Sequence, residues 1–127
     1  MKILVCGNPL VKQDSAALKA AKDLKKILPE VEFEEFDSVE ELQDEEINIL
    51  DVVEGLKKPK VIKNIDDIKI GKIYSTHDFD LGQNLKLLKK LGLIGKVTIF
   101  GVPGRINKKT VGQLAELIKS NLPSGNA

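Results

Sequence analysis

A short apolar run that ends abruptly before a helical pattern constrains the fold of this chain more than any other feature. Residues 3–6 have the branched, apolar composition of a buried strand, and Gly7, Asn8 and Pro9 cannot extend it. From Asp14 onward, apolar residues recur at three- and four-residue steps, which is typical of a helix that packs on a sheet. We therefore expect a central strand, a sharp turn and then a covering helix.

The remainder of the chain repeats this alternation of strands and helices. Further strands are predicted at residues 31–36, 47–53, 59–65 and 97–101, and further helices at residues 81–91 and 108–121. This order predicts an α/β fold: a single three-layer domain over residues 1–127, with a mostly parallel, twisted five-stranded sheet and helices on both faces. The short link at residues 55–58 suggests a hairpin, so one strand is expected to be antiparallel. The strand at 31–36 is expected near a sheet edge.

Composition limits the functions that this fold can serve. The chain has 127 residues, 42% of them apolar, and a formal net charge of +1. One hydrophobic core can be buried at this length, and the low charge argues against nucleic acid as a partner. The single cysteine, Cys6, excludes an internal disulfide and is expected to fill the core. No leader or membrane-spanning run is recognisable, so we expect a cytoplasmic protein without a membrane partner.

Three side chains are expected at the edge of the sheet where its parallel strands end. Asp14 opens the first helix, Asp51 lies near the carboxyl end of the third strand, and His77 lies in a loop before a helix. Ligands of open α/β sheets bind outside the carboxyl ends of the strands. Two carboxylates and an imidazole suit a borderline divalent ion, which also removes the repulsion between the carboxylates. These residues form a candidate metal site.

Simpler roles also fit two of these residues. Asp14 has the position of an ordinary helix cap, and His77 has that of a surface residue or a helix-entry contact. Other chemistries have less support, because the chain lacks the dinucleotide fingerprint, the phosphate-binding loop and the nucleophile elbow. A serine or cysteine protease is therefore not supported.

Four sequence motifs, taken in order, resemble one known family. They are the first strand with Gly7-Asn8 and then Asp14, the third strand ending in Asp51, Ser75-Thr76-His77 followed by Leu81-Gly82, and the fifth strand followed by Gly101-Val102-Pro103. This series resembles the hydrogenase maturation endopeptidases, which remove a carboxyl-terminal extension from the large subunit of nickel-iron hydrogenases. The resemblance covers most of the chain and agrees with the predicted order of strands and helices.

The resemblance implies a partner and a role for each candidate residue. The partner is the large-subunit precursor of a nickel-iron hydrogenase, and the expected activity is endopeptidase cleavage. Asp14, Asp51 and His77 are implied to be the catalytic residues and to contact the nickel that the precursor already carries. No cofactor is expected to be permanently bound, because the substrate supplies the nickel, although other divalent metals can occupy the same site. Asp37, Gly7 and Asn8 are implied to contact the substrate.

Two non-enzymatic functions remain as alternatives. A receiver-like signalling domain also carries an aspartate at the end of its third strand, where Asp51 lies. Receivers place an acidic pair after the first strand and a lysine after the fifth, whereas this chain has residues 7–9 and 101–104 there. A metal-sensing or partner-docking module would use the same residues as the peptidase without cutting its partner.

Overall fold

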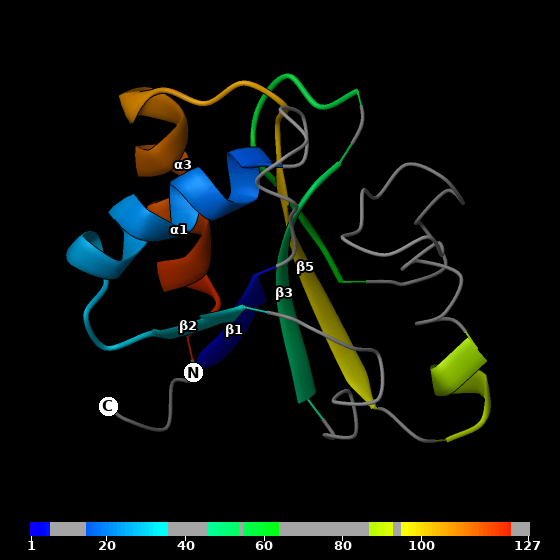
Figure 1. Ribbon diagram of the computed structural model, residues 1–127. Helices are drawn as coiled ribbons and strands as arrows, with labels where there is room; N and C mark the ends of the chain where they lie inside the picture. Colours follow the sequence, from blue (N-terminus) through cyan, green and yellow to red (C-terminus); the bar gives the residue numbers. More distant parts are fainter. Residues whose placement is uncertain (6–14, 36–45, 54, 64–86, 93–94, 123–127) are drawn as a thin grey trace.

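The computed structural model (Figure 1) describes residues 1–5, 15–35, 46–53, 55–63, 87–92 and 95–122. These residues form one five-stranded sheet and two full helices. The strands are β1 (Lys2–Val5), β2 (Glu32–Glu35), β3 (Glu46–Val52), β4 (Lys60–Ile62) and β5 (Lys96–Val102), and the helices are α1 (Ser15–Ile27) and α3 (Lys108–Ser120). Neither helix has the length and hydropathy of a membrane span.

The sheet has the strand order β2-β1-β3-β5-β4 and is mostly parallel. β1 pairs in parallel with β2 and β3, and β3 pairs in parallel with β5, whereas β4 is antiparallel to β5. The predicted α/β fold with one antiparallel strand is therefore confirmed, as is the edge position of β2. The predicted hairpin is wrong, because β4 pairs with β5 and not with the strand before it. Both sides of β3 are already paired, so β4 has to cross to the free side of β5.

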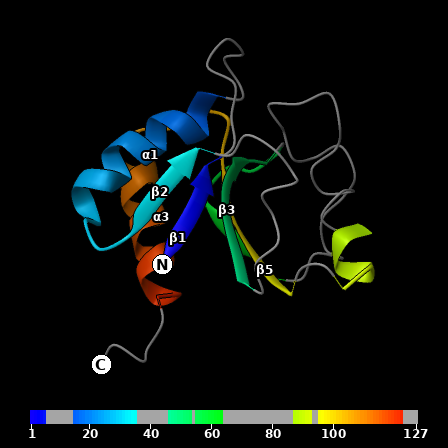
Figure 2. The ribbon, with the colours of Figure 1, turned by 60° about the horizontal axis from the view of Figure 1, so that its bottom comes forward.

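Helices α1 and α3 pack on the same face of the sheet, and Figures 1 and 2 show them side by side there. The buried side of α1 is rich in alanine, which lets the helix lie close to the strands, and α3 contributes larger aliphatic residues. The residues of this core include Ile3, Val5, Ala17, Ala21, Leu24, Leu50, Val52, Phe100, Val102, Leu114 and Ile118. Both helices follow the stripes that the sequence predicted.

α3 begins where a side chain can satisfy its free backbone donors. Asn107 is the N-cap residue, and its Oδ1 accepts a hydrogen bond from the Thr110 N–H at 2.9 Å. The Thr110 hydroxyl also donates a hydrogen bond of 3.0 Å to Asn107 Oδ1. This local signal explains why the predicted helix start at residue 108 agrees with the structure.

The second face of the central strands is also apolar and buried. Ile47 and Ile49 of β3, and Val97 and Ile99 of β5, are at most 3% exposed. Strands that are covered on both faces have continuous apolar sequences, which is the pattern that β3 and β5 show. A short helical segment at residues 87–90 lies on this side of the sheet in Figures 1 and 2, with Leu88 partly buried and Leu91 exposed.

Candidate functional site

Asp51 lies in the middle of the sheet, near the carboxyl end of β3. β3 is the third of the five strands in the order of the sheet, and the Asp51 side chain has no exposed surface. Transfer of an ionised carboxylate from water into a protein interior is unfavourable unless hydrogen bonds or a cation compensate for it. A carboxylate at this position therefore requires specific partners, and the edge at which it lies is the usual ligand-binding edge of an open α/β sheet.

One partner of Asp51 is the backbone of the next residue. The Val52 N–H donates a hydrogen bond of 2.8 Å to Asp51 Oδ1. The neighbouring Val53 N–H donates to the Val102 carbonyl oxygen of β5. Because successive N–H groups of a strand point to opposite sides, the Val52 N–H points to the side of β3 that faces β1.

The pairing between β1 and β3 is described as far as Val5, the last described residue before α1. Its last pair is Val5 with Leu50, whereas the pairing of β3 with β5 continues to Val52 and Val102. Asp51 Oδ1 therefore accepts a hydrogen bond from a backbone donor that points away from β5. The carboxylate thus has a structural contact in addition to the ligand contact predicted for it.

The Asp51 side chain lies on the face of the sheet opposite α1 and α3. Leu50 and Val52 belong to the core that those helices cover, and side chains of a strand alternate between faces. On the same face as Asp51, the neighbouring position of β5 is Gly101. The metal-binding prediction for Asp51 therefore concerns the second face of the sheet, at its carboxyl edge.

Gly101 leaves space that a larger residue would fill. A Cβ built at this position would be 2.8 Å from Leu56 Cδ1, 3.1 Å from Val53 Cγ2 and 3.3 Å from the Lys60 carbonyl oxygen. The glycine therefore lets the chain after β3 and the edge strand β4 pack closely beside Asp51. The strand was predicted to end at Gly101, but β5 continues through it to Val102.

The other predicted site residues lie outside the described residues. Gly7 and Asn8 follow the carboxyl end of β1, Asp14 directly precedes α1, Asp37 follows the end of β2, and His77 belongs to residues 64–86. Among the described residues, no group of three or more His, Cys, Asp and Glu side chains is arranged to hold a metal ion. The three-residue metal site therefore stays a prediction.

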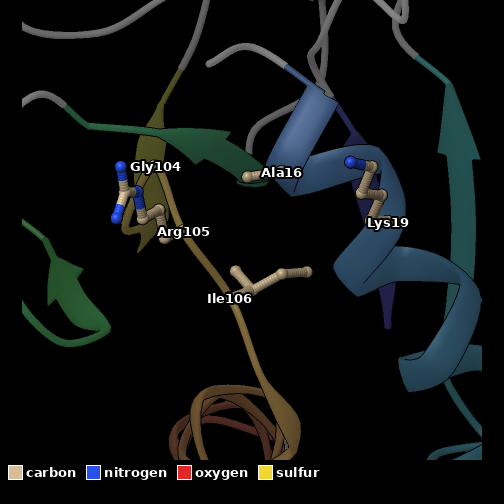
Figure 3. A pocket seen from close by; sticks show the side chains of 5 residues that line it. All are labelled: Ala16, Lys19, Gly104, Arg105 and Ile106. Atoms are coloured by element: carbon tan, nitrogen blue, oxygen red, sulfur yellow. The ribbon is translucent and has the colours of Figure 1, made fainter. Parts of the chain in front are cut away.

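A pocket at the carboxyl edge is lined by residues that were not among the predicted site residues. Ala16 and Lys19 of α1, together with Gly104, Arg105 and Ile106 after β5, line a cavity of about 330 Å³ (Figure 3). We call it the Lys19–Arg105 pocket. The rule that ligands bind beyond strand ends could have drawn attention to Arg105. Lys19 carries no comparable signal, because it is one of several lysines on an amphipathic helix.

Comparison with known protein families assigns the chain to a family. The family model described as hydrogenase maturation protease matches residues 19–125 of the chain. The chain belongs to the hydrogenase maturation protease family. The family resemblance predicted from the sequence motifs is thereby confirmed, and membership supports a protease function in hydrogenase maturation. The matched range contains Asp37, Asp51 and His77, as well as Lys19 and Arg105, whereas Gly7, Asn8 and Asp14 precede it.

Similarity to individual proteins adds nothing to this assignment. No match was found among curated proteins or among solved structures. Family membership and the residues at the carboxyl edge of the sheet are therefore the basis for a function.

Proposed function

We propose that this chain is an endopeptidase that removes the carboxyl-terminal extension of a nickel-iron hydrogenase large-subunit precursor in the cytoplasm, after nickel insertion. The observation that carries the proposal is Asp51, a fully buried carboxylate near the carboxyl end of a central strand, in a hydrogenase maturation protease. Asp14 and His77 complete the proposed nickel contact. In this view the metal belongs to the substrate, and the protein has no permanently bound cofactor.

The chemistry of the three side chains supports recognition of a divalent metal. Carboxylate oxygens and a neutral imidazole are ligands for nickel and similar ions, and the unperturbed histidine pKa leaves much of the imidazole neutral near pH 7. A buried carboxylate such as Asp51 gains most from a nearby cation, because little solvent screens the attraction. A precursor without nickel lacks the cation that attracts the Asp51 carboxylate, so it would bind more weakly than a nickel-loaded precursor.

Recognition of the metal would couple cleavage to the assembly state of the precursor. Contacts between the nickel and the three residues would fix the position of the extension relative to the protease, which lowers the entropic part of the barrier. The bound cation would also polarise a nearby carbonyl group or water molecule. Asp37, Gly7 and Asn8 are proposed to contact the extension on the same edge.

The experiment compares nickel-loaded and nickel-free precursor as substrates of the purified protein, with the shortened subunit detected by mass spectrometry. Only the loaded precursor is expected to be cut. His77→Ala should retain the wild-type circular dichroism spectrum and unfolding midpoint, yet yield no shortened product. Lys96→Ala, at the exposed amino end of β5, serves as the control and should cleave normally.

Two results would change the proposal. Cleavage by His77→Ala at the wild-type rate would remove His77 from the mechanism. Tight binding of the loaded precursor by the wild-type protein, without any shortened product, would instead favour the metal-sensing or partner-docking module.

A further inference from the structure

The Lys19–Arg105 pocket combines two positive charges with an apolar wall. Its described lining contains the side chains of Lys19 and Arg105, the buried Ala16 and the half-buried Ile106, with no acidic residue among them. In Figure 3 Lys19 and Arg105 lie on opposite sides of the pocket with Ile106 between them, and the exposed Arg105 guanidinium points away from Lys19. A small anionic group with an apolar neighbour would match this arrangement of charge and surface.

The two cations are available to a ligand within the part of the chain that the structure describes. Neither Lys19 nor Arg105 forms an ion pair with a described residue, and both side chains are exposed. Other lysines in the same range do form ion pairs, Lys2 with Glu34 and Lys119 with Glu116. The charge of the pocket is therefore not neutralised by described acidic neighbours.

We propose that the Lys19–Arg105 pocket binds the terminal carboxylate of the precursor's extension, an inference that rests on the proposed function. A carboxyl-terminal extension ends in a carboxylate whatever its sequence, so this group is present in every substrate of such a protease. Arg105 is exposed, so its side chain can turn toward the pocket and hold a carboxylate through two parallel hydrogen bonds, while Lys19 adds a second charge from the facing helix. Ile106 and Ala16 would contact the last side chain of the extension.

The position of the pocket is consistent with a substrate that crosses the edge of the sheet. Gly104, the first residue of the pocket after β5, lies two residues beyond the end of that strand. Asp51 pairs with Gly101 of the same strand. The pocket lies on the side of α1, whereas the Asp51 side chain lies on the opposite face of the same edge. An extended tail passing over this edge would place its metal-proximal part near Asp51 and its end near α1.

The test uses nickel-loaded precursor in two forms, one with its natural carboxylate and one with a carboxyl-terminal amide introduced by peptide ligation. Wild-type protein is compared with the double variant Lys19→Glu/Arg105→Glu. Lys22→Glu/Lys96→Glu is the control, because it makes the same charge change at exposed positions outside the pocket. A milder pair, Lys19→Gln/Arg105→Gln, keeps the test decisive if charge reversal prevents folding.

We expect both the amide and the charge reversal to raise the KM by about tenfold, with little change in kcat, because each removes a charge-assisted contact. The two changes should not multiply, since they remove the same interaction. The control variant should cleave both forms as wild type does.

The remaining outcomes overturn the inference in distinguishable ways. If the wild-type protein cleaves the precursor and the pocket variants keep its KM, the pocket has no role but the proposed function is upheld. If the variants raise the KM but the amide does not, the pocket binds an acidic side chain and not the terminus. If the wild-type protein cuts neither loaded form, the proposed function fails and the inference fails with it.

Discussion

The polar side chains at the two ends of the central strand β3 differ in charge and in burial. Near its amino end, Asn48 is a neutral amide that is 8% exposed and donates one long hydrogen bond of 3.4 Å to the Lys2 carbonyl oxygen. Near its carboxyl end, Asp51 is a carboxylate with no exposed surface. Both side chains form a hydrogen bond with the backbone. A neutral acceptor would be enough for the bond that Asp51 makes, so that bond does not explain the negative charge of Asp51. The comparison predicts that substitutions at the amino end change stability alone, whereas substitutions of Asp51 change cleavage.

Neutralisation of Asp51 tests this contrast with the largest expected effect. Asp51→Asn keeps an oxygen that can accept from the Val52 N–H but removes the charge. We expect cleavage of the nickel-loaded precursor to fall by about 10- to 100-fold, the range for loss of a group that supports a metal. The free energy of unfolding should not fall, because a neutral amide is easier to bury than a carboxylate.

Asp51→Ala separates the structural role of the carboxylate from its charge. This variant also removes the acceptor of the Val52 N–H, so urea denaturation should show a loss of about 1–3 kcal/mol relative to Asp51→Asn. Normal cleavage by Asp51→Asn would contradict the contrast, because Asp51 would then be only a hydrogen-bond acceptor.

A substitution at Gly101 tests whether close packing beside Asp51 contributes to stability. Gly101→Ala would place a methyl group 3.1 Å from Val53 Cγ2 and 3.3 Å from the Lys60 carbonyl oxygen. The Leu56 side chain can rotate away, but the β4 backbone cannot move without disturbing the sheet. We expect a destabilisation of about 2 kcal/mol, measured by urea denaturation.

Gly112→Ala is the matched control for this substitution. Gly112 lies within α3, and a Cβ built there meets nothing within 4 Å. Alanine should therefore stabilise the protein by about 0.5–1 kcal/mol, because it lowers the entropy of the unfolded chain and favours the helix. Equal effects of the two substitutions would show that close packing at Gly101 is unimportant.

The sequence predicted those parts of this edge that depend on local patterns. The continuous apolar runs of β3 and β5 and the position of Asp51 near a strand end were recognisable, because burial on both faces leaves a direct signal. The partner of β4 was not, since only three of its residues pair and its contact with β5 is distant along the chain. The Lys19–Arg105 pocket also depends on two distant segments, and its cations resemble ordinary surface residues.

Asn48 provides the corresponding test at the amino end of β3. Asn48→Ala removes a single long hydrogen bond to the Lys2 carbonyl oxygen and leaves a backbone acceptor close to solvent. We expect a loss of about 1 kcal/mol in unfolding free energy and no change in kcat/KM for the loaded precursor. A large fall in kcat/KM without a loss of stability would remove the distinction between the two ends.

The smallest effect is expected at the exposed ion pair near the same end. Lys2 Nζ and Glu34 Oε2 are 3.0 Å apart, and both side chains are about half exposed, at 48% and 50%. Solvent screens such a pair and ordering its long side chains opposes it, so Glu34→Gln should lower the unfolding free energy by less than about 0.5 kcal/mol. The difference from wild type should shrink further at high salt, because ions screen exposed charges. Asp51 is buried, so ions in solution cannot replace its charge, and added salt should not restore cleavage by Asp51→Asn. A Glu34→Gln effect as large as that of Gly101→Ala would mean that charge at the amino end is also structurally important.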